Sequence, residues 1–253
     1  MLRRRLFIAY LCAGFLGLTV PGGTVARAEV KPSIEPHAEE LLKAALTFLA
    51  KAPSITFHAE VTKEVPLSSG VKVLHTGTLE MAVRRPDRIS YKRDDDEALT
   101  TGTYDGALFT LHDVGKKTCA SWPVKEKLDG LFANLKENLG FQPPLARFLT
   151  ENVADEALKN VTTGFSAGRS VIRGVACEQL VFRQQNLDWQ VWIATEGDPV
   201  IRRMVFTHRN DPTLPQSSVA FLDWDFKAVL SDSVFIFQVP QGLVQCEFEP
   251  VKK

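Results

Sequence analysis

Cysteine is scarce in this chain and its charge is balanced: 253 residues include 4 cysteines, 30 basic residues and 30 acidic residues. The chain lacks a Gly-x-Ser-x-Gly nucleophile elbow, a phosphate-binding loop and a dinucleotide-binding glycine pattern. Its five histidines stand apart, without the spacing typical of a metal site. These absences argue against the common hydrolase, nucleotide-binding and zinc-dependent classes. We expect a protein that is not an enzyme and that carries no cofactor and no metal.

The balanced charge also argues against a nucleic-acid partner. The first 28 residues hold four arginines and no acid, so without them 26 basic and 30 acidic residues remain, a net charge of −4. Binding to nucleic acid depends on a clustered positive surface, which this composition does not favour.

Residues 1–28 have the three parts of a secretory signal peptide. Arg3, Arg4 and Arg5 form a basic start, residues 6–20 are largely apolar, and Ala26-Arg27-Ala28 is a small-x-small cleavage site. The apolar run is shorter than the roughly 20 residues that a spanning helix needs, which favours cleavage after Ala28 over an uncleaved anchor. No later run is long enough to span. We therefore expect an exported, periplasmic protein whose mature part is one domain over residues 29–253.

The cysteines leave two interpretations open. Cys12 lies inside the signal and lacks the small preceding residue of a lipid-attachment site, so we do not expect lipidation. Of the remaining three, at most one pair bonds within the chain, most plausibly Cys177 with Cys246. Alternatively, all three are small apolar residues on strands.

Hydrophobic spacing predicts helices and strands in separate blocks. Apolar residues at steps of three and one predict an amphipathic helix over residues 36–52. Alternation then predicts strands over 55–61, 71–84, 88–93, 99–104, 107–112 and 118–122, with a tight hairpin at Asp105-Gly106. Two helices follow, one ending at Gly140 and one beginning at Pro143-Pro144. Further strands are expected from about residue 161, over 175–183, 189–195, 201–208 and 217–225, and weakly over 234–237 and 244–248. This order predicts an antiparallel α+β domain.

Several phrases in this order resemble a family of uncharacterised bacterial periplasmic proteins. They are Arg84-Arg85-Pro86-Asp87-Arg88, Tyr104-Asp105-Gly106, Pro143-Pro144-Leu145, Gly174-Val175-Ala176-Cys177, Asp188-Trp189-Gln190-Val191-Trp192-Ile193 and Trp224. That family is grouped with the lipoprotein-carrier superfamily, which includes LolA- and LolB-like carriers. The resemblance covers residues 35–248.

The resemblance implies one strongly curved antiparallel sheet, an incomplete barrel of about eleven strands with helices on its concave face. It also implies an apolar cavity for a lipid or an acyl-bearing ligand, with transient contact to a membrane surface. An envelope sensor or adaptor that acts through a protein partner is the alternative. No catalytic residue and no ligand-gating residue is carried over to this chain.

Aromatic and large apolar residues are the candidates for the cavity wall. Trp189 and Trp192 differ by three positions within one predicted strand, so they face opposite sides of the sheet. The full candidate set is Phe57, Met81, Phe109, Trp122, Trp189, Trp192, Phe206, Phe221 and Trp224. An ordinary packed core is the alternative for each of them.

One cluster of arginines and one pair of aspartates each allow a functional and a purely structural interpretation. Arg84, Arg85 and Arg88 are candidates for contact with a lipid headgroup or a surface, because arginine binds phosphate in a fork. A solvated turn with local ion pairs is favoured over that role. Asp223 and Asp225 flank Trp224 on one strand face, but no nucleophile accompanies them, so catalysis there is not expected.

Overall fold

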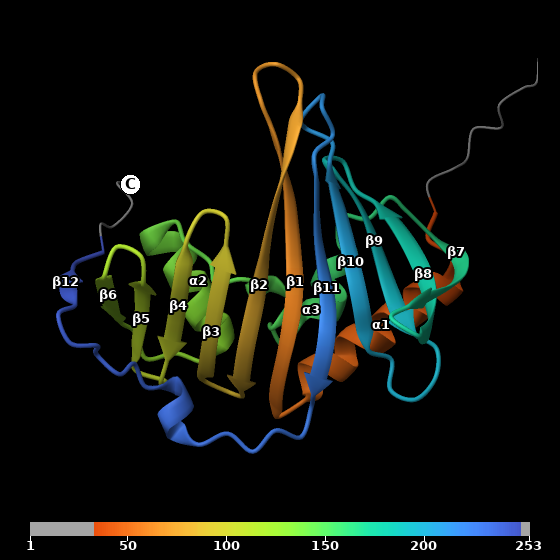
Figure 1. The fold of residues 1–253 in the computed structure, drawn as a ribbon. Helices are drawn as coiled ribbons and strands as arrows, with labels where there is room; N and C mark the ends of the chain where they lie inside the picture. Colours follow the sequence, from red (N-terminus) through yellow and green to blue (C-terminus); the bar gives the residue numbers. More distant parts are fainter. Residues whose placement is uncertain (1–32, 249–253) are drawn as a thin grey trace, which may run out of the picture. The chain divides into compact units, whose positions relative to one another are not determined.

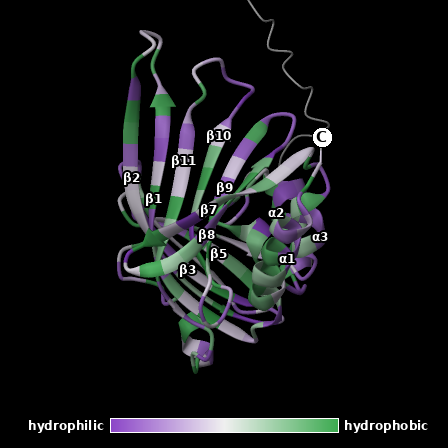
Figure 2. Ribbon diagram, turned by 90° about the vertical axis from the view of Figure 1, so that its right-hand side faces the viewer, coloured by the Kyte–Doolittle hydropathy of each residue, from purple (hydrophilic) through white to green (hydrophobic). Residues whose placement is uncertain are grey.

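The computed structural model describes residues 33–248 of the chain, and the expected signal peptide and Cys12 lie outside this range. These residues form one twelve-stranded sheet with helices packed on one of its faces (Figures 1 and 2). The helices are α1 (Pro36–Lys51), α2 (Leu128–Leu139) and α3 (Val153–Leu158), with short 3₁₀ turns η1 (Ala146–Phe148) and η2 (Asp232–Phe235). No helix of the described residues is both long and apolar enough to cross a membrane.

The strands follow the predicted blocks closely. The first half gives β1 (Ser54–Pro66), β2 (Lys72–Arg84), β3 (Arg88–Asp95), β4 (Leu99–Tyr104), β5 (Leu108–Asp113) and β6 (Thr118–Pro123). The second half gives β7 (Thr163–Ile172), β8 (Val175–Arg183), β9 (Leu187–Ala194), β10 (Ile201–His208), β11 (Gln216–Asp225) and β12 (Val244–Cys246). The expected hairpin at Gly106 is present, with φ of 91° at that glycine.

The two halves of the sheet join through β1 and β11. The spatial order is β12-β6-β5-β4-β3-β2-β1-β11-β10-β9-β8-β7, so an antiparallel meander lies on each side of this junction. The sheet does not close, and only the short β12 is parallel to its neighbour. This confirms the predicted single curved, mostly antiparallel sheet. About eleven strands were expected, and the short β12 makes the observed number twelve.

Alternation along each strand decides which side chains meet the helices. In β1, Ile55, Phe57 and Ala59 are buried, whereas the alternate residues His58 and Glu60 are exposed. The buried positions pack with the apolar faces of α1 and α2 in one core. Because neither helix buries its apolar stripe alone, the helices and the concave face of the sheet stabilise one another.

Two local predictions differ from the structure. The helix expected from Pro143 is a turn followed by η1 and α3, because Leu145 adopts the left-handed conformation (φ 55°) that an α-helix cannot continue through. The weak strand expected over 234–237 is instead η2 and an extended segment. In contrast, Gly140 ends α2 as expected, with φ of 62° and its N–H directed at the last turn.

Of the two interpretations of the cysteines, the Cys177–Cys246 disulfide is wrong, because the two residues lie near opposite ends of the sheet, in β8 and β12. All three described cysteines are free thiols. Cys119 in β6 neighbours β12, but it pairs in register with Gln245, so its side chain and that of Cys246 point to opposite faces. The alternative of small buried residues holds for Cys119 and Cys177, whereas Cys246 is exposed.

The hydroxyl of Tyr104 fastens the segment that leads into α2. It lies 2.7 Å from the carbonyl oxygen of Glu126 and 3.1 Å from that of Val124, and it accepts the N–H of Glu126 at 3.0 Å. Tyr104 is fully buried. The hydroxyl of Tyr91, which is also buried, has no hydrogen-bond partner among residues 33–248.

These two tyrosines give a matched pair of substitutions. Tyr104→Phe should lower the free energy of unfolding by about 1–2 kcal/mol, because it leaves buried backbone groups unpaired. Tyr91→Phe should be neutral or slightly stabilising. Urea unfolding of the two variants measures the difference; equal losses of stability would contradict the assigned role of Tyr104.

Candidate functional site

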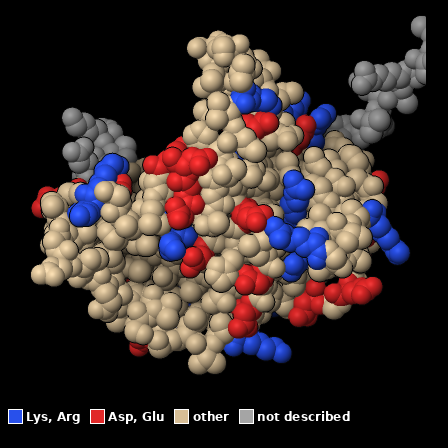
Figure 3. Space-filling model, in the orientation of Figure 1, with Lys and Arg blue, Asp and Glu red and all other residues tan. Residues whose placement is uncertain are grey.

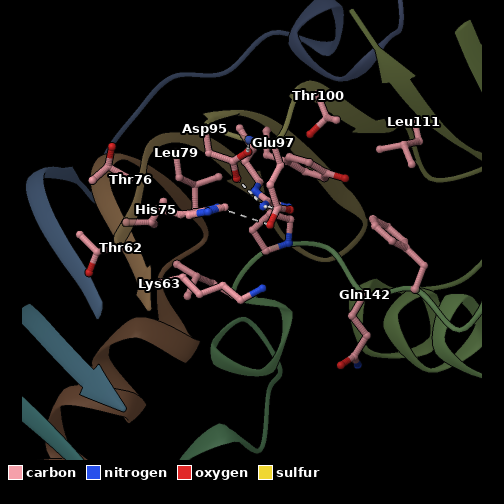
Figure 4. Close-up of a pocket in the computed structure, with 16 residues that line it drawn as sticks. Thr62, Lys63, His75, Thr76, Leu79, Asp95, Glu97, Thr100, Leu111 and Gln142 are labelled. Atoms are coloured by element: carbon pink, nitrogen blue, oxygen red, sulfur yellow. Dashed lines mark hydrogen bonds and ion pairs between the residues drawn. The ribbon is translucent and has the colours of Figure 1, made fainter. Parts of the chain in front are cut away.

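A cavity of about 370 Å³ lies between the concave face of the sheet and the segment that follows α2 (Figure 4). Its volume falls near the lower end of the range for small-ligand pockets. The walls come from β1 to β5 on one side and from residues 141–145 on the other. They comprise Val61, Thr62, Lys63, His75, Thr76, Leu79, Tyr91, Arg93, Asp95, Glu97, Thr100, Leu111, Phe141, Gln142, Pro144 and Leu145.

Strand register sorts these walls into an apolar part and a polar mouth. In the register of the sheet, Lys63 of β1 is opposite His75 of β2, and Leu79 of β2 is opposite Arg93 of β3. The polar and charged side chains therefore cluster toward the hairpin that joins β1 and β2. On the same face, Val61 lies two residues from Lys63 and Leu79 lies four residues from His75, and the opposite wall adds apolar groups from Phe141 and Leu145. The cavity is therefore amphiphilic, with its charges at one end.

Three charged side chains and His75 form a connected polar cluster at the mouth. Glu97 lies 3.7 Å from Nδ1 of His75 and 3.6 Å from Arg93, and Arg93 also pairs with Asp95. Partial burial acts to raise the pKa of Asp95, but hydrogen bonds from the backbone N–H groups of Ala98 (3.1 Å) and Glu97 (3.0 Å), together with Arg93, lower it overall. Asp95 is therefore an ionised, internally satisfied carboxylate near neutral pH.

Lys63 is the charged residue of the mouth that takes no part in these ion pairs. Its side chain extends toward the cavity in Figure 4, and within the described part of the chain it makes no ion pair. Its neighbours across the sheet are His75 in β2 and Ser217 in β11, so no carboxylate lies directly beside it.

Tyr91 forms a buried part of the wall. Its ring lies over Gly102 of the adjacent strand, where an added Cβ would overlap the ring and the hydroxyl oxygen. Burial raises the pKa of the Tyr91 phenol, and Arg93 opposes this only in part. The phenol therefore stays neutral across the physiological pH range.

None of the nine predicted wall residues lines this cavity. The structure brings three of them together beneath α1: Phe57, Phe221 and Trp224 have ring centroids 4.6–5.3 Å apart. The void that they border with Phe148 holds only about 10 Å³. This part of the concave face is packed core, with the Trp224 indole N–H bonded to the carbonyl of Ile201 at 2.9 Å.

The other six candidates lie elsewhere. Met81, Phe109 and Trp189 are buried in the main core, and Trp189 stacks on Phe182 with centroids 4.4 Å apart. Trp122 donates to Asn134 of α2 at 2.9 Å, and Phe206 packs near Phe148. Trp192 lies on the opposite, convex face with Cys177 and Val205, with Arg203 over its ring. The two tryptophans of β9 thus do face opposite sides.

The three predicted headgroup arginines lie far from the cavity mouth. Arg84 is nine residues along β2 from His75, about 30 Å at strand spacing. Each arginine contacts another part of the protein or a sequence neighbour: Arg84 binds the carbonyl of Leu230, Arg85 binds that of Leu149 at 2.6 Å, and Arg88 pairs with the adjacent Asp87. Burial lowers the pKa of Arg85, although Asp129 and Glu151 oppose this.

A second, wider hollow of about 550 Å³ lies on the convex face, under residues 234–238. His58 lines it and binds Asp223 through Nδ1 at 3.0 Å. The surface around it carries mixed charges rather than one sign (Figure 3). Asp223 and Asp225 are exposed there, and among residues 33–248 no group of three metal-ligating side chains occurs.

Residues 38–249 match a protein family described as "Predicted periplasmic protein (DUF2092)". The match covers most of the chain, so this protein belongs to that family, which confirms the resemblance to a periplasmic family. No curated protein matches the sequence.

Among solved structures, LprF from Mycobacterium bovis is 13% identical, with a TM-score of 0.48 over 84% of this chain and 99% of that one. LppX from Mycobacterium tuberculosis is 12% identical, with a TM-score of 0.40 over 78% and 98%. The Pseudomonas aeruginosa MucA/MucB complex is 10% identical, with a TM-score of 0.45 over 80% and 61%.

Proposed function

We propose that this member of a periplasmic family is a non-enzymatic binding protein that holds a lipid or an acylated ligand. The amphiphilic cavity on the concave face carries the proposal. Its apolar part would shield an acyl chain, and each buried methylene contributes about 0.8 kcal/mol. The polar mouth would keep the head of the ligand near water. The expected export fits this role, with a signal cleaved after Ala28 and one mature domain over 29–253.

Exchange of the ligand would require the cover over the cavity to move. Residues 141–145 form this cover, between the end of α2 and η1. At its N-terminal end Phe141 donates its N–H to the carbonyl of Leu135 at 3.3 Å, and beyond its C-terminal end Arg85 binds the carbonyl of Leu149. Opening would therefore displace a short irregular segment rather than the strands, in keeping with the low local stability typical of gating segments.

Mass spectrometry of the protein purified from the periplasm without detergent tests this function. A lipid or acylated species that co-purifies at about one per chain and is lost on organic extraction would support it. Protein that is ligand-free and binds no acyl probe would contradict it. A stoichiometric membrane-protein partner without lipid would then favour the alternative, an envelope sensor or adaptor.

The tip of the β1–β2 hairpin supports transient contact with a membrane surface. The hairpin rises well above the neighbouring strands in Figure 1, and residues 65–71 carry no charge. Its large side chains are exposed, among them Leu67 at 47%, Val71 at 60% and Leu74 at 57%. A narrow apolar tip suits insertion among lipid headgroups, and the cavity mouth lies at the base of the same hairpin.

Replacing Leu67 and Leu74 together with aspartate should weaken co-sedimentation with phospholipid vesicles by about tenfold, because two apolar contacts are lost. Val171→Asp is the matched control, since Val171 is also exposed (67%) but lies near the turn between β7 and β8. Equal vesicle binding by both variants would rule out the hairpin as the contact.

A further inference from the structure

We infer that the cavity selects a single-chain amphiphile with an anionic head, and that Lys63 pairs with that head. This inference rests on the proposed function and specifies its ligand class. The volume of about 370 Å³ sets the number of chains, because it lies near the lower limit for small-ligand pockets. The charge of the head is set by the groups at the mouth.

The acidic side chains at the mouth are already engaged. Asp95 accepts two backbone N–H groups and pairs with Arg93. Glu97 lies between His75 and Arg93. Both carboxylates pair with Nη2 of Arg93, so the charge of this guanidinium is already balanced within the mouth.

Lys63 has the opposite character. It is exposed and extends toward the cavity, and it is flanked by Ser217 and His75 rather than by a carboxylate. It lies on the same strand face as Val61, two residues away, where the apolar wall begins. A chain lying along Val61 and Leu79 would therefore bring its head next to the ammonium group.

This arrangement also fixes the orientation of the ligand. The head would lie at the hairpin end of β1 and β2, and the chain would run toward Leu111 and Phe141. The shared chemistry is an oxyanion on one acyl chain, which either a fatty-acid carboxylate or the phosphate of a lysophospholipid supplies.

The test compares an anionic ligand with its neutral ester on the same acyl chain, and adds a second anionic head. Dissociation constants are measured for palmitate, methyl palmitate and lysophosphatidylglycerol, with the wild-type protein and with Lys63→Gln. Wild type should bind the anions more tightly than the ester. Lys63→Gln should weaken binding of the anions by about threefold, the size typical of an exposed ion pair, and leave the ester unchanged. Lys63→Glu should extend the loss, and added salt should reduce the preference.

Lys92→Gln is the matched control, because Lys92 lies in β3 on the convex face and pairs with Glu80 at 3.3 Å. It should leave all three constants unchanged. If palmitate and its ester bind equally to wild type, the headgroup inference fails while the acyl cavity stands. If none of the three binds, the proposed function fails with it. Between the anions, tighter binding of palmitate indicates a fatty acid, and tighter binding of lysophosphatidylglycerol indicates a phospholipid source.

Discussion

Gly102→Ala should lower the free energy of unfolding by about 2–3 kcal/mol, the cost expected for an overpacked core. The added methyl group would overlap Cε1, Cζ and the hydroxyl oxygen of Tyr91, whose ring is only 3% exposed. The strain must be taken up by β3 and β4 or by displacement of the ring into the adjacent cavity. The melting temperature should fall by about 5–10 °C, which thermal unfolding followed by circular dichroism would measure.

Gly115→Ala is the control for the loss of a glycine. An added Cβ there would meet only Asp113, at an ordinary 3.6 Å, in the turn between β5 and β6. A second substitution, Tyr91→Ala, should be less harmful in the Gly102→Ala background than in the wild type, because the two residues compete for one space. Equal stability of Gly102→Ala and Gly115→Ala would show that Tyr91 does not depend on the glycine.

The strands were predictable because apolar and polar residues alternate in the sequence over long segments, and burial follows the same alternation. In β1, β2 and β3 this alternation extends along most of the strand and leaves little doubt about their faces. The closeness of Gly102 and Tyr91 was not predictable, because it depends on the register between β3 and β4. The distance between the cysteines was not predictable either, because it depends on the order of the strands in the sheet. That order separates Cys177 from Cys246, and spacing along the chain carries no such information.

The resemblance implied a cavity, but the residues that line it were not predictable, for a related reason. Large aromatic residues are the obvious candidates for its walls, but such groups pack well against one another and leave little space, as Phe57, Phe221 and Trp224 do. The open part of the concave face instead carries smaller and polar residues. One signal was present in the sequence: the alternation of Ile55, Phe57, Ala59 and Val61 continues to Lys63, which places a charge on the buried face of a strand. The sequence of residues 141–145, which form the cover, holds no comparable signal. The contacts of this segment are set by the left-handed turn at Leu145.

Val61→Trp should weaken acyl-chain binding by about 50-fold while the protein stays folded. Val61 is only partly buried and faces the cavity, so an indole at this position can extend into the space of about 370 Å³. Each methylene group that the indole keeps out removes about 0.8 kcal/mol of binding free energy, so the exclusion of three weakens binding by about 50-fold.

Displacement of a fluorescent fatty-acid probe from the purified protein would measure this loss, with thermal unfolding as the check on folding. Val61→Ala should retain binding, because it leaves the cavity open. Val171→Trp makes the same substitution as Val61→Trp at an exposed position of β7 and should change neither binding nor stability by much. If Val61→Trp binds the probe as the wild type does, the ligand lies elsewhere, and the wider hollow under residues 234–238 becomes the next surface to test. If Val61→Trp loses its melting transition as well as its binding, Val61 is needed for folding. The smaller Val61→Leu then separates the effect on folding from the effect on ligand binding, because it narrows the cavity with less strain.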